Sequence, residues 1–177
     1  GKKSLPDPPI ASIGYQASIV ITPQQEADMD IKATLNNLLI PYTSNYAGTL
    51  LPGIREYTVT PGEKTTTISG KGKAGLKQEE NYYFFYLPVC YKGITGKSYA
   101  YYNTSRSKNL YLPASVDENY SYDIQLPENL TLCTPIQEKK IDNPIGSFKI
   151  TLTSEGSSLH IELALQIKKQ LITPAEY

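Results

Sequence analysis

The feature that most constrains this 177-residue chain is a strict alternation of apolar and polar residues at positions 159–167. Every second residue of this run is Leu or Ile, five in all, and the residues between them are mostly polar. Successive side chains of a β-strand point to opposite faces, so the five aliphatic side chains share one face. A helix would need apolar residues three and four positions apart. The run therefore predicts a half-buried antiparallel strand, because strands of parallel sheets are usually apolar on both faces.

Two upstream runs repeat the pattern. Residues 148–152 alternate in the same way, and the polar, glycine-containing residues 153–157 lead into the run just described, which predicts a β-hairpin. Residues 120–126 form a third run, which ends at Pro127 because proline cannot donate a backbone hydrogen bond. A single sheet cannot hide its apolar face, so a second layer is implied. We therefore expect an all-β chain built as an antiparallel β-sandwich.

The earlier part of the chain gives similar signals. Residues 17–22 and 29–35 are separated by a turn at Pro23 and predict a second hairpin, and β-prone residues flank Pro61-Gly62. The 13 prolines and 12 glycines recur at short intervals, which is typical of many short strands joined by turns. Residues 70–75 are rich in glycine and lysine but lack the spacing of a phosphate-binding loop, so we expect a mobile surface loop there.

The expected organisation is two sandwich-like lobes that divide near Asn109. Residues 1–9 are polar and Pro-rich and are expected to be a linker or tail. The N-terminal β lobe would cover residues 10–108, and the C-terminal β-sandwich lobe residues 109–177. Within the first lobe, residues 81–91 are apolar at nearly every position, which favours a central sandwich strand or a segment that passes under a loop.

Charge and hydropathy exclude several partners. The chain has 17 basic and 17 acidic residues, so it lacks the basic surplus that nucleic acids and anionic membranes attract. No apolar run approaches the roughly 20 residues of a transmembrane helix. Asp28 and Asp30 lack the further ligands and glycine of a calcium loop, and we expect them to face solvent on a strand. We expect no metal and no cofactor.

The 15 tyrosines suggest one binding surface. Tyr99, Tyr101 and Tyr102 could form a stacking platform for sugars or peptides, because each ring offers an apolar face and a hydroxyl. The alternative is that these rings pack in the core or pair across strands. Cys90 and Cys133 allow one disulfide, or both could be buried thiols that behave as small apolar side chains.

The sequence does not show a catalytic constellation. His160 is the only histidine and lies on the polar face of its predicted strand, with Ser158 and Glu162 two positions away. Neither cysteine stands at a helix start, where a thiolate would be stabilised. Glu162 and Asp123 could serve as the carboxylate pair of a glycosidase, but nothing in the sequence brings them together. We therefore expect a surface histidine and no catalytic residue.

Residues 106–113 (RSKNLYLP) and 120–128 (YSYDIQLPE) resemble the C-terminal region of transglutaminase-like proteins of Bacteroidetes, which are grouped with cysteine peptidases. In those proteins a β-rich region of unknown function follows the papain-like catalytic core. Phe148, the alternating strand and the closing residues 174–177 (PAEY) complete the pattern, which covers about residues 78–177. Asn129 replaces the glycine of that pattern, and asparagine also tolerates left-handed backbone.

The resemblance implies a non-catalytic accessory β domain, because the catalytic Cys, His and Asp of that family have no counterpart here. Such a domain would support its own upstream transglutaminase-like domain or present a polypeptide substrate. The resemblance also implies a periplasmic, cell-surface or secreted location. The alternative is an extracytoplasmic glycan-binding module that uses exposed tyrosines.

Overall fold

The computed structural model describes residues 10–36, 51, 53–90, 107–112, 114–133 and 137–176. These residues form β-strands and connecting turns, which confirms the all-β fold. Eight strands make one large sheet: β1 (Ile10–Ile21), β2 (Glu26–Asn36), β3 (Ile54–Pro61), β4 (Thr65–Gly75), β8 (Ser115–Gln125), β9 (Gln137–Asp142), β10 (Gly146–Glu155) and β11 (Ser158–Ile167). Two small sheets pair β5 (Lys77–Glu79) with β6 (Tyr82–Phe84) and β7 (Leu110–Tyr111) with β12 (Leu171–Ile172). Within these ranges, none of the chain forms a helix that could cross a bilayer.

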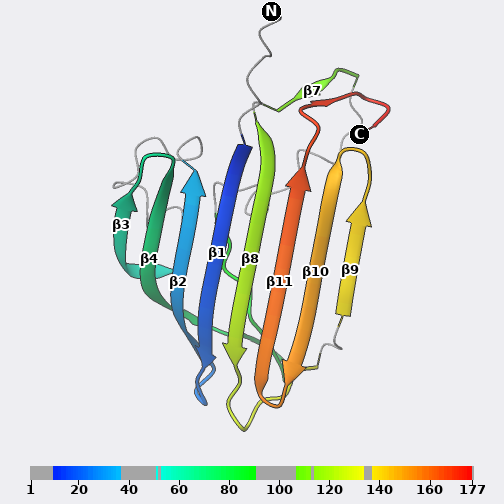
Figure 1. Cartoon of the computed structure of the whole chain (residues 1–177). Coiled ribbons are helices and arrows are strands. Elements are labelled where there is room, and N and C mark those ends of the chain that lie inside the picture. Colours follow the sequence, from blue (N-terminus) through cyan, green and yellow to red (C-terminus); the bar gives the residue numbers. More distant parts are fainter. Residues whose placement is uncertain are drawn as a thin grey trace, which may run out of the picture.

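The large sheet has the strand order β3-β4-β2-β1-β8-β11-β10-β9 (Figure 1). Its neighbours are antiparallel except β1 and β8, which run parallel from the pair Ile10 and Ser115 to the pair Val20 and Gln125. Strands from both sides of Asn109 thus lie in one sheet, while the division into two lobes stays a prediction. The parallel pair was not expected, because β1 alternates apolar and polar residues as an antiparallel strand does.

The two predicted hairpins form, the β-prone residues that flank Pro61-Gly62 form a third, and the turns explain them. Residues 22–25 join β1 to β2, with Gln25 at a positive φ of 59°. Gly156 and Ser157 join β10 to β11, and Gly156 has a φ of 59°. A glycine at positive φ in the first central position is typical of a two-residue type II′ turn, whose twist matches that of the flanking strands. The β3–β4 hairpin turns at residues 62–64.

One face of the sheet is apolar and the other is polar. The apolar face carries the alternate side chains of β1, β2, β8 and β11 that the sequence predicts, among them Ile19, Ile31 and Ile161, all buried. Three buried tyrosines lie at its centre: Tyr15 of β1 is 5.2 Å from Tyr120 and 5.9 Å from Tyr122, between ring centroids. The opposite face, which is turned toward the viewer in Figure 1, is mostly polar and exposed.

The chain after β4 covers part of the apolar face. Residues 85–90 pack on it through Phe85, Leu87 and Val89, and the Tyr122 hydroxyl donates a hydrogen bond to the Pro88 carbonyl oxygen at 2.7 Å. Of the two alternatives expected for residues 81–91, the central sandwich strand is wrong for the described residues 81–90, since among them only Tyr82–Phe84 form a strand and that strand pairs with β5. Residues 81–90 carry apolar side chains in two environments. Some pack on the sheet, while Tyr82, Phe84 and Tyr86 are exposed.

Residues 70–75 are not a surface loop, and that expectation was wrong. They form the second half of β4, with Lys71 and Lys73 exposed and Gly70 and Gly72 buried. The start of β3 runs very close to these glycines. A Cβ on Gly70 would lie 2.5 Å from the Glu56 carbonyl oxygen, and a Cβ on Gly72 would overlap the carbonyl oxygen of Gly53. Gly70 and Gly72 of β4 therefore allow the backbone at the start of β3 to approach β4 closely.

Candidate functional site on the polar face of the sheet

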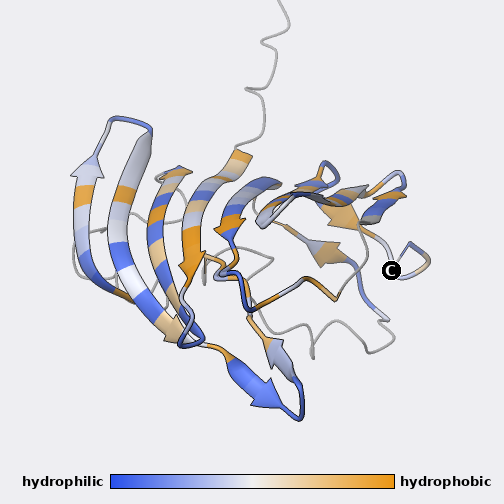
Figure 2. Ribbon diagram, turned by 90° about the horizontal axis from the view of Figure 1, so that it is seen from below, coloured by the Kyte–Doolittle hydropathy of each residue, from blue (hydrophilic) through white to orange (hydrophobic). Residues whose placement is uncertain are grey.

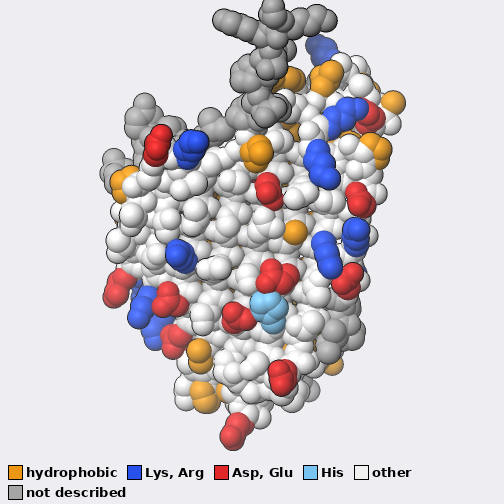
Figure 3. Space-filling model, viewed as in Figure 1, with side chains coloured by type: hydrophobic (Ala, Val, Ile, Leu, Met, Phe, Trp, Pro, Cys, Tyr) orange, Lys and Arg blue, Asp and Glu red, His pale blue; other side chains and the backbone are white. Residues whose placement is uncertain are grey.

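A single histidine and two carboxylates meet on the polar face. His160 of β11 lies directly opposite Asp123 of the antiparallel strand β8. Glu162 lies two residues further along β11, so its side chain emerges on the same face as that of His160. Figure 3 shows the histidine flanked by acidic side chains near the middle of this face.

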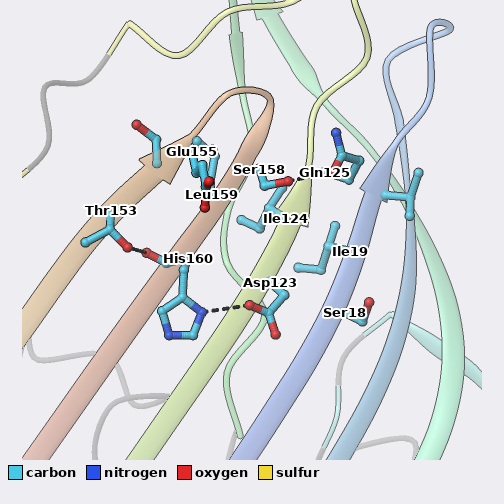
Figure 4. A pocket seen from close by; sticks show the side chains of 12 residues that line it. Ser18, Ile19, Asp123, Ile124, Gln125, Thr153, Glu155, Ser158, Leu159 and His160 are labelled. Atoms are coloured by element: carbon cyan, nitrogen blue, oxygen red, sulfur yellow. Dashed lines mark hydrogen bonds and ion pairs between the residues drawn. The ribbon is translucent and has the colours of Figure 1, made fainter.

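Both nitrogens of the imidazole ring contact a carboxylate. The distance from His160 Nδ1 to Asp123 Oδ1 is 2.7 Å, and that from His160 Nε2 to Glu162 Oε1 is also 2.7 Å. Figure 4 shows the Nδ1 contact as a dashed line between β11 and β8. Ser121 extends the network by donating a hydrogen bond from its hydroxyl to Glu162 Oε1 at 3.0 Å. Only the protonated imidazolium can donate from both ring nitrogens at once, so this geometry favours the charged histidine.

The same contacts raise the pKa of His160 above its ordinary value of 6.5. The hydrogen bond to Asp123 is the largest cause, and the hydrogen bond to Glu162 and the charges of both carboxylates add to it, while desolvation opposes them. The side chains of His160, Asp123 and Glu162 are 44%, 75% and 54% exposed, so solvent screens these interactions. The cluster is therefore a surface ion-pair network that is strongest when His160 is charged.

The network lacks the contacts of nucleophilic catalysis. A general base must reach the proton of a hydroxyl or thiol, yet both ring nitrogens of His160 already face carboxylates. Cys90 is buried and packs in the apolar core, while Cys133 is exposed beyond the end of β8, and the two are not joined by a disulfide. The sequence named Asp123 and Glu162 as a possible carboxylate pair without a reason for them to meet, and the sheet register brings both to the imidazole of His160.

The arrangement does not form a metal site. Asp123 and Glu162 contact opposite nitrogens of one ring, so their oxygens do not converge on a common point. No group of three or more His, Cys, Asp and Glu side chains suited to a metal ion occurs among the residues described here. Asp28, one of the two aspartates considered for calcium, forms an ion pair of 2.9 Å with Lys73 of β4. Asp30 is exposed on β2, as expected for a strand residue that faces solvent.

Further polar residues surround the network on this face. Thr153 of β10 lies opposite His160, Ser18 of β1 lies opposite Asp123, and Asp30 of β2 lies opposite Ser18. These residues form a row across neighbouring strands, because facing residues in a sheet lie side by side. The tyrosines expected to form a platform, Tyr99, Tyr101 and Tyr102, lie outside the described residues, as does the expected tail at residues 1–9. Both expectations stay predictions.

The fold and this face together define an all-β module with one polar sheet surface. Residues 81–177, more than half of the chain, match the family described as "Domain of Unknown Function with solved-structure structure (DUF3858)", and the chain belongs to this family. The match coincides closely with the region of residues 78–177 in which the sequence resemblance was drawn.

Part of this chain is also similar to part of a longer protein of known structure. It is the crystal structure of "a putative protease" from Parabacteroides distasonis, with 32% sequence identity and a TM-score of 0.47. The aligned part is 51% of this chain and 18% of that one. No curated protein matches this chain.

Proposed function

We propose that this chain is a non-catalytic accessory β domain of a transglutaminase-like protein located in the periplasm or at the cell surface. It supports the catalytic domain of that protein or presents a polypeptide substrate to it. Family membership over residues 81–177 supports the coarser part of this proposal, a domain without an assigned activity. The resemblance to the C-terminal region of transglutaminase-like proteins supports the finer part.

The observation that supports the proposal is that carboxylates contact both ring nitrogens of His160. Its two ring nitrogens each contact a carboxylate at 2.7 Å, so the histidine is held as the centre of an ion-pair network. A histidine that acts as a general base needs one nitrogen free to take a proton. The polar side chains of β1, β2, β8 and β11 instead form a broad exposed surface, which suits contact with another domain better than chemistry on a small molecule.

The test begins with the isolated chain. We expect it to fold and to show neither peptide-bond hydrolysis nor transfer of an amine to glutamine with casein as substrate. Activity that is present in the wild-type chain and lost in the His160→Asn variant would overturn the proposal, because this substitution keeps the size and polarity of the exposed side chain but removes its basic nitrogen. Thr153→Ala, on the neighbouring strand, is the matched control.

The second step uses the longer protein. We expect the reading frame that encodes this chain to encode a transglutaminase-like core upstream, and we expect that core to lose thermal stability or activity when residues 10–177 are removed. The melting temperature of the core with and without these residues measures the effect. A reading frame without such a core would contradict the proposal. The glycan-binding alternative depends on Tyr99, Tyr101 and Tyr102, and no described residue adds to it.

A further inference from the structure

A groove lies at the end of the sheet where β1 and β8 end, on the apolar side. Its volume is about 540 Å³. Figure 2 shows the β5–β6 hairpin standing away from the sheet on this side. The hairpin forms one wall of the groove, residues 126–133 after β8 contribute to another, and core side chains of the sheet form the floor.

The described residues that line the groove include no charged side chain. The floor includes Ile124, Leu159 and Ile161, which are also members of the buried core. A charged ligand group would lose its hydration here without meeting a countercharge, which is unfavourable. The chemistry of the groove therefore fits uncharged, apolar groups.

The mouth of the groove exposes large apolar side chains. Tyr82 is 54% exposed, Phe84 44% and Leu132 36%. Three of the ten large apolar residues that are exposed in the described part of the chain thus line this one groove. Isolated apolar residues are common on protein surfaces, but a group of them around a concave site is typical of a binding surface.

The groove runs along the edge of a strand. Tyr82, Tyr83 and Phe84 are consecutive residues of β6 and all line it. Successive side chains of a strand point to opposite faces, so three in a row can border one groove only if the groove follows the strand edge. In the described ranges β6 pairs with β5 alone, which leaves its other edge without a partner strand. Such an edge can form backbone hydrogen bonds to an added strand.

Two amide side chains provide further polar contacts within the groove. Asn81 precedes β6, and Asn129 lies in the opposite segment, where its amide nitrogen is 3.5 Å from the Pro23 carbonyl oxygen, at the outer limit of a hydrogen bond. Amides can both donate to and accept from a peptide backbone. An apolar groove with a few polar groups and an unpaired strand edge matches the needs of an extended peptide more closely than those of a lipid chain, which makes no hydrogen bonds along its length.

We propose that this groove binds an extended, uncharged polypeptide segment whose apolar side chains enter the groove while its backbone pairs with β6. The proposal rests on the proposed function, because it specifies the class of polypeptide that the domain would present. The side chains of the bound segment alternate, so every second residue faces the floor.

The experiment uses the absence of tryptophan from this chain. A capped synthetic peptide, Thr-Val-Thr-Trp-Thr-Val-Thr, carries the only tryptophan in the mixture, and its fluorescence reports transfer of the indole from water into the groove. We expect a saturable blue shift with the folded, full-length chain. A peptide of the same sequence with N-methyl groups on the backbone amides of one edge should bind at least about ten-fold more weakly, because it cannot pair with β6.

Variants of the groove complete the test. Leu132→Asp places a charge at the mouth of the groove and should weaken peptide binding at least about ten-fold. The matched control is Leu171→Asp, the same substitution at another exposed leucine that does not line the groove, and it should leave binding unchanged. Tyr82→Asp serves as a second groove variant if Leu132→Asp does not fold, as judged by circular dichroism.

Three outcomes would overturn the groove proposal. They are equal binding by wild type and by the folded groove variants, equal binding of the N-methylated peptide, and saturable binding of decanoate without binding of the peptide. None of these bears on whether removal of residues 10–177 destabilises an upstream catalytic core, so failure of the groove and failure of the accessory role are distinguishable.

Discussion

At the scale of single residues, His160 couples two strands through its charge. The imidazolium contacts Asp123 on β8 and Glu162 on its own strand, and both contacts raise its pKa above 6.5. A group whose pKa is higher in the folded than in the unfolded state stabilises the fold fully below the unfolded pKa. That stabilisation is lost as the pH rises through the folded pKa. The network therefore favours the folded state most in mildly acidic solution.

This predicts the titration of the one histidine in the chain. Its ring protons, followed by nuclear magnetic resonance, should titrate with a pKa above 6.5 in the wild-type protein. Asp123→Asn should lower this pKa more than Glu162→Gln does, because the hydrogen bond to Asp123 is the largest cause of the shift. The melting temperature of wild type relative to His160→Gln should fall as the pH rises past 6.5. A pKa at or below 6.5 in the folded protein would contradict the network.

Two buried tyrosines with neighbouring rings should respond differently to loss of the hydroxyl. Tyr122 donates to the Pro88 carbonyl oxygen at 2.7 Å, whereas the buried Tyr15 hydroxyl has no hydrogen-bond partner among the residues that the structure describes. Removing a buried hydrogen bond costs about 1 kcal/mol, but removing a polar group that is buried without a partner does not. Tyr122→Phe should therefore lower the melting temperature by about 2–4 °C, and Tyr15→Phe should leave it unchanged or raise it. Equal losses in the two variants would show that the Pro88 contact does not stabilise the fold.

At the scale of elements, the glycines of β4 allow β3 to approach. The ladder between β3 and β4 shifts register between Ile54 and Glu56, and Gly72 pairs with Ile54 next to this irregularity. Since a Cβ on Gly72 would overlap the Gly53 carbonyl oxygen, the side chain of any other residue would push the two strands apart. The close approach is a property of the two backbones, which the composition of residues 70–75 does not reveal.

Gly72→Ala should therefore destabilise the protein by about 1–3 kcal/mol, the usual cost of forcing atoms into a packed site. Gly75→Ala is the matched control, because a Cβ there has nothing within 4 Å. It should change the free energy of unfolding by less than about 0.5 kcal/mol. Urea unfolding followed by circular dichroism measures both. A Gly72→Ala protein as stable as the Gly75→Ala protein would show that β3 moves away without cost.

The hairpins could be predicted from the sequence because their signals are local. Alternation fixes which side chains of β11 point inward, and a short polar turn with Gly156 connects it to β10. The glycine-rich half of β4 was mistaken for a loop because glycine is the usual mark of a turn, and only the position of β3 explains its use in a strand. The sequence also left the structure of residues 85–90 open, because the sheet on which they pack is formed by residues distant in the sequence.

The candidate site was only partly predictable. The polar-face positions of His160 and Glu162 follow from the alternation of β11. Their meeting with Asp123 depends on the register between β8 and β11, which pairs residues 37 positions apart in the sequence. The groove beside β6 is lined by both the β5–β6 hairpin and residues from 126–133, and no single run of the sequence contains both.

At the scale of the whole molecule, the central contact is the parallel pair of β1 and β8. The family match begins at residue 81, so β8 to β11 lie inside the matched region and β1 to β4 lie outside it. The sheet nevertheless continues across this boundary, and the tyrosine cluster draws Tyr15 from one side and Tyr120 and Tyr122 from the other. A sheet and a core shared in this way favour folding of both parts as one unit.

This predicts the behaviour of the expected C-terminal lobe, residues 109–177, when it is expressed alone. Without β1, strand β8 becomes an edge strand with unpaired backbone groups, and the rings of Tyr120 and Tyr122 lose their contact with Tyr15. We expect the fragment to lack a cooperative thermal transition, whereas residues 10–177 unfold in one. Calorimetry on both proteins measures this, with residues 10–177 carrying Tyr15→Leu, which removes the aromatic ring, as a control for loss of the ring contact alone. A fragment that unfolds cooperatively would instead establish residues 109–177 as an independent lobe, and the parallel pair would then be a contact between two domains.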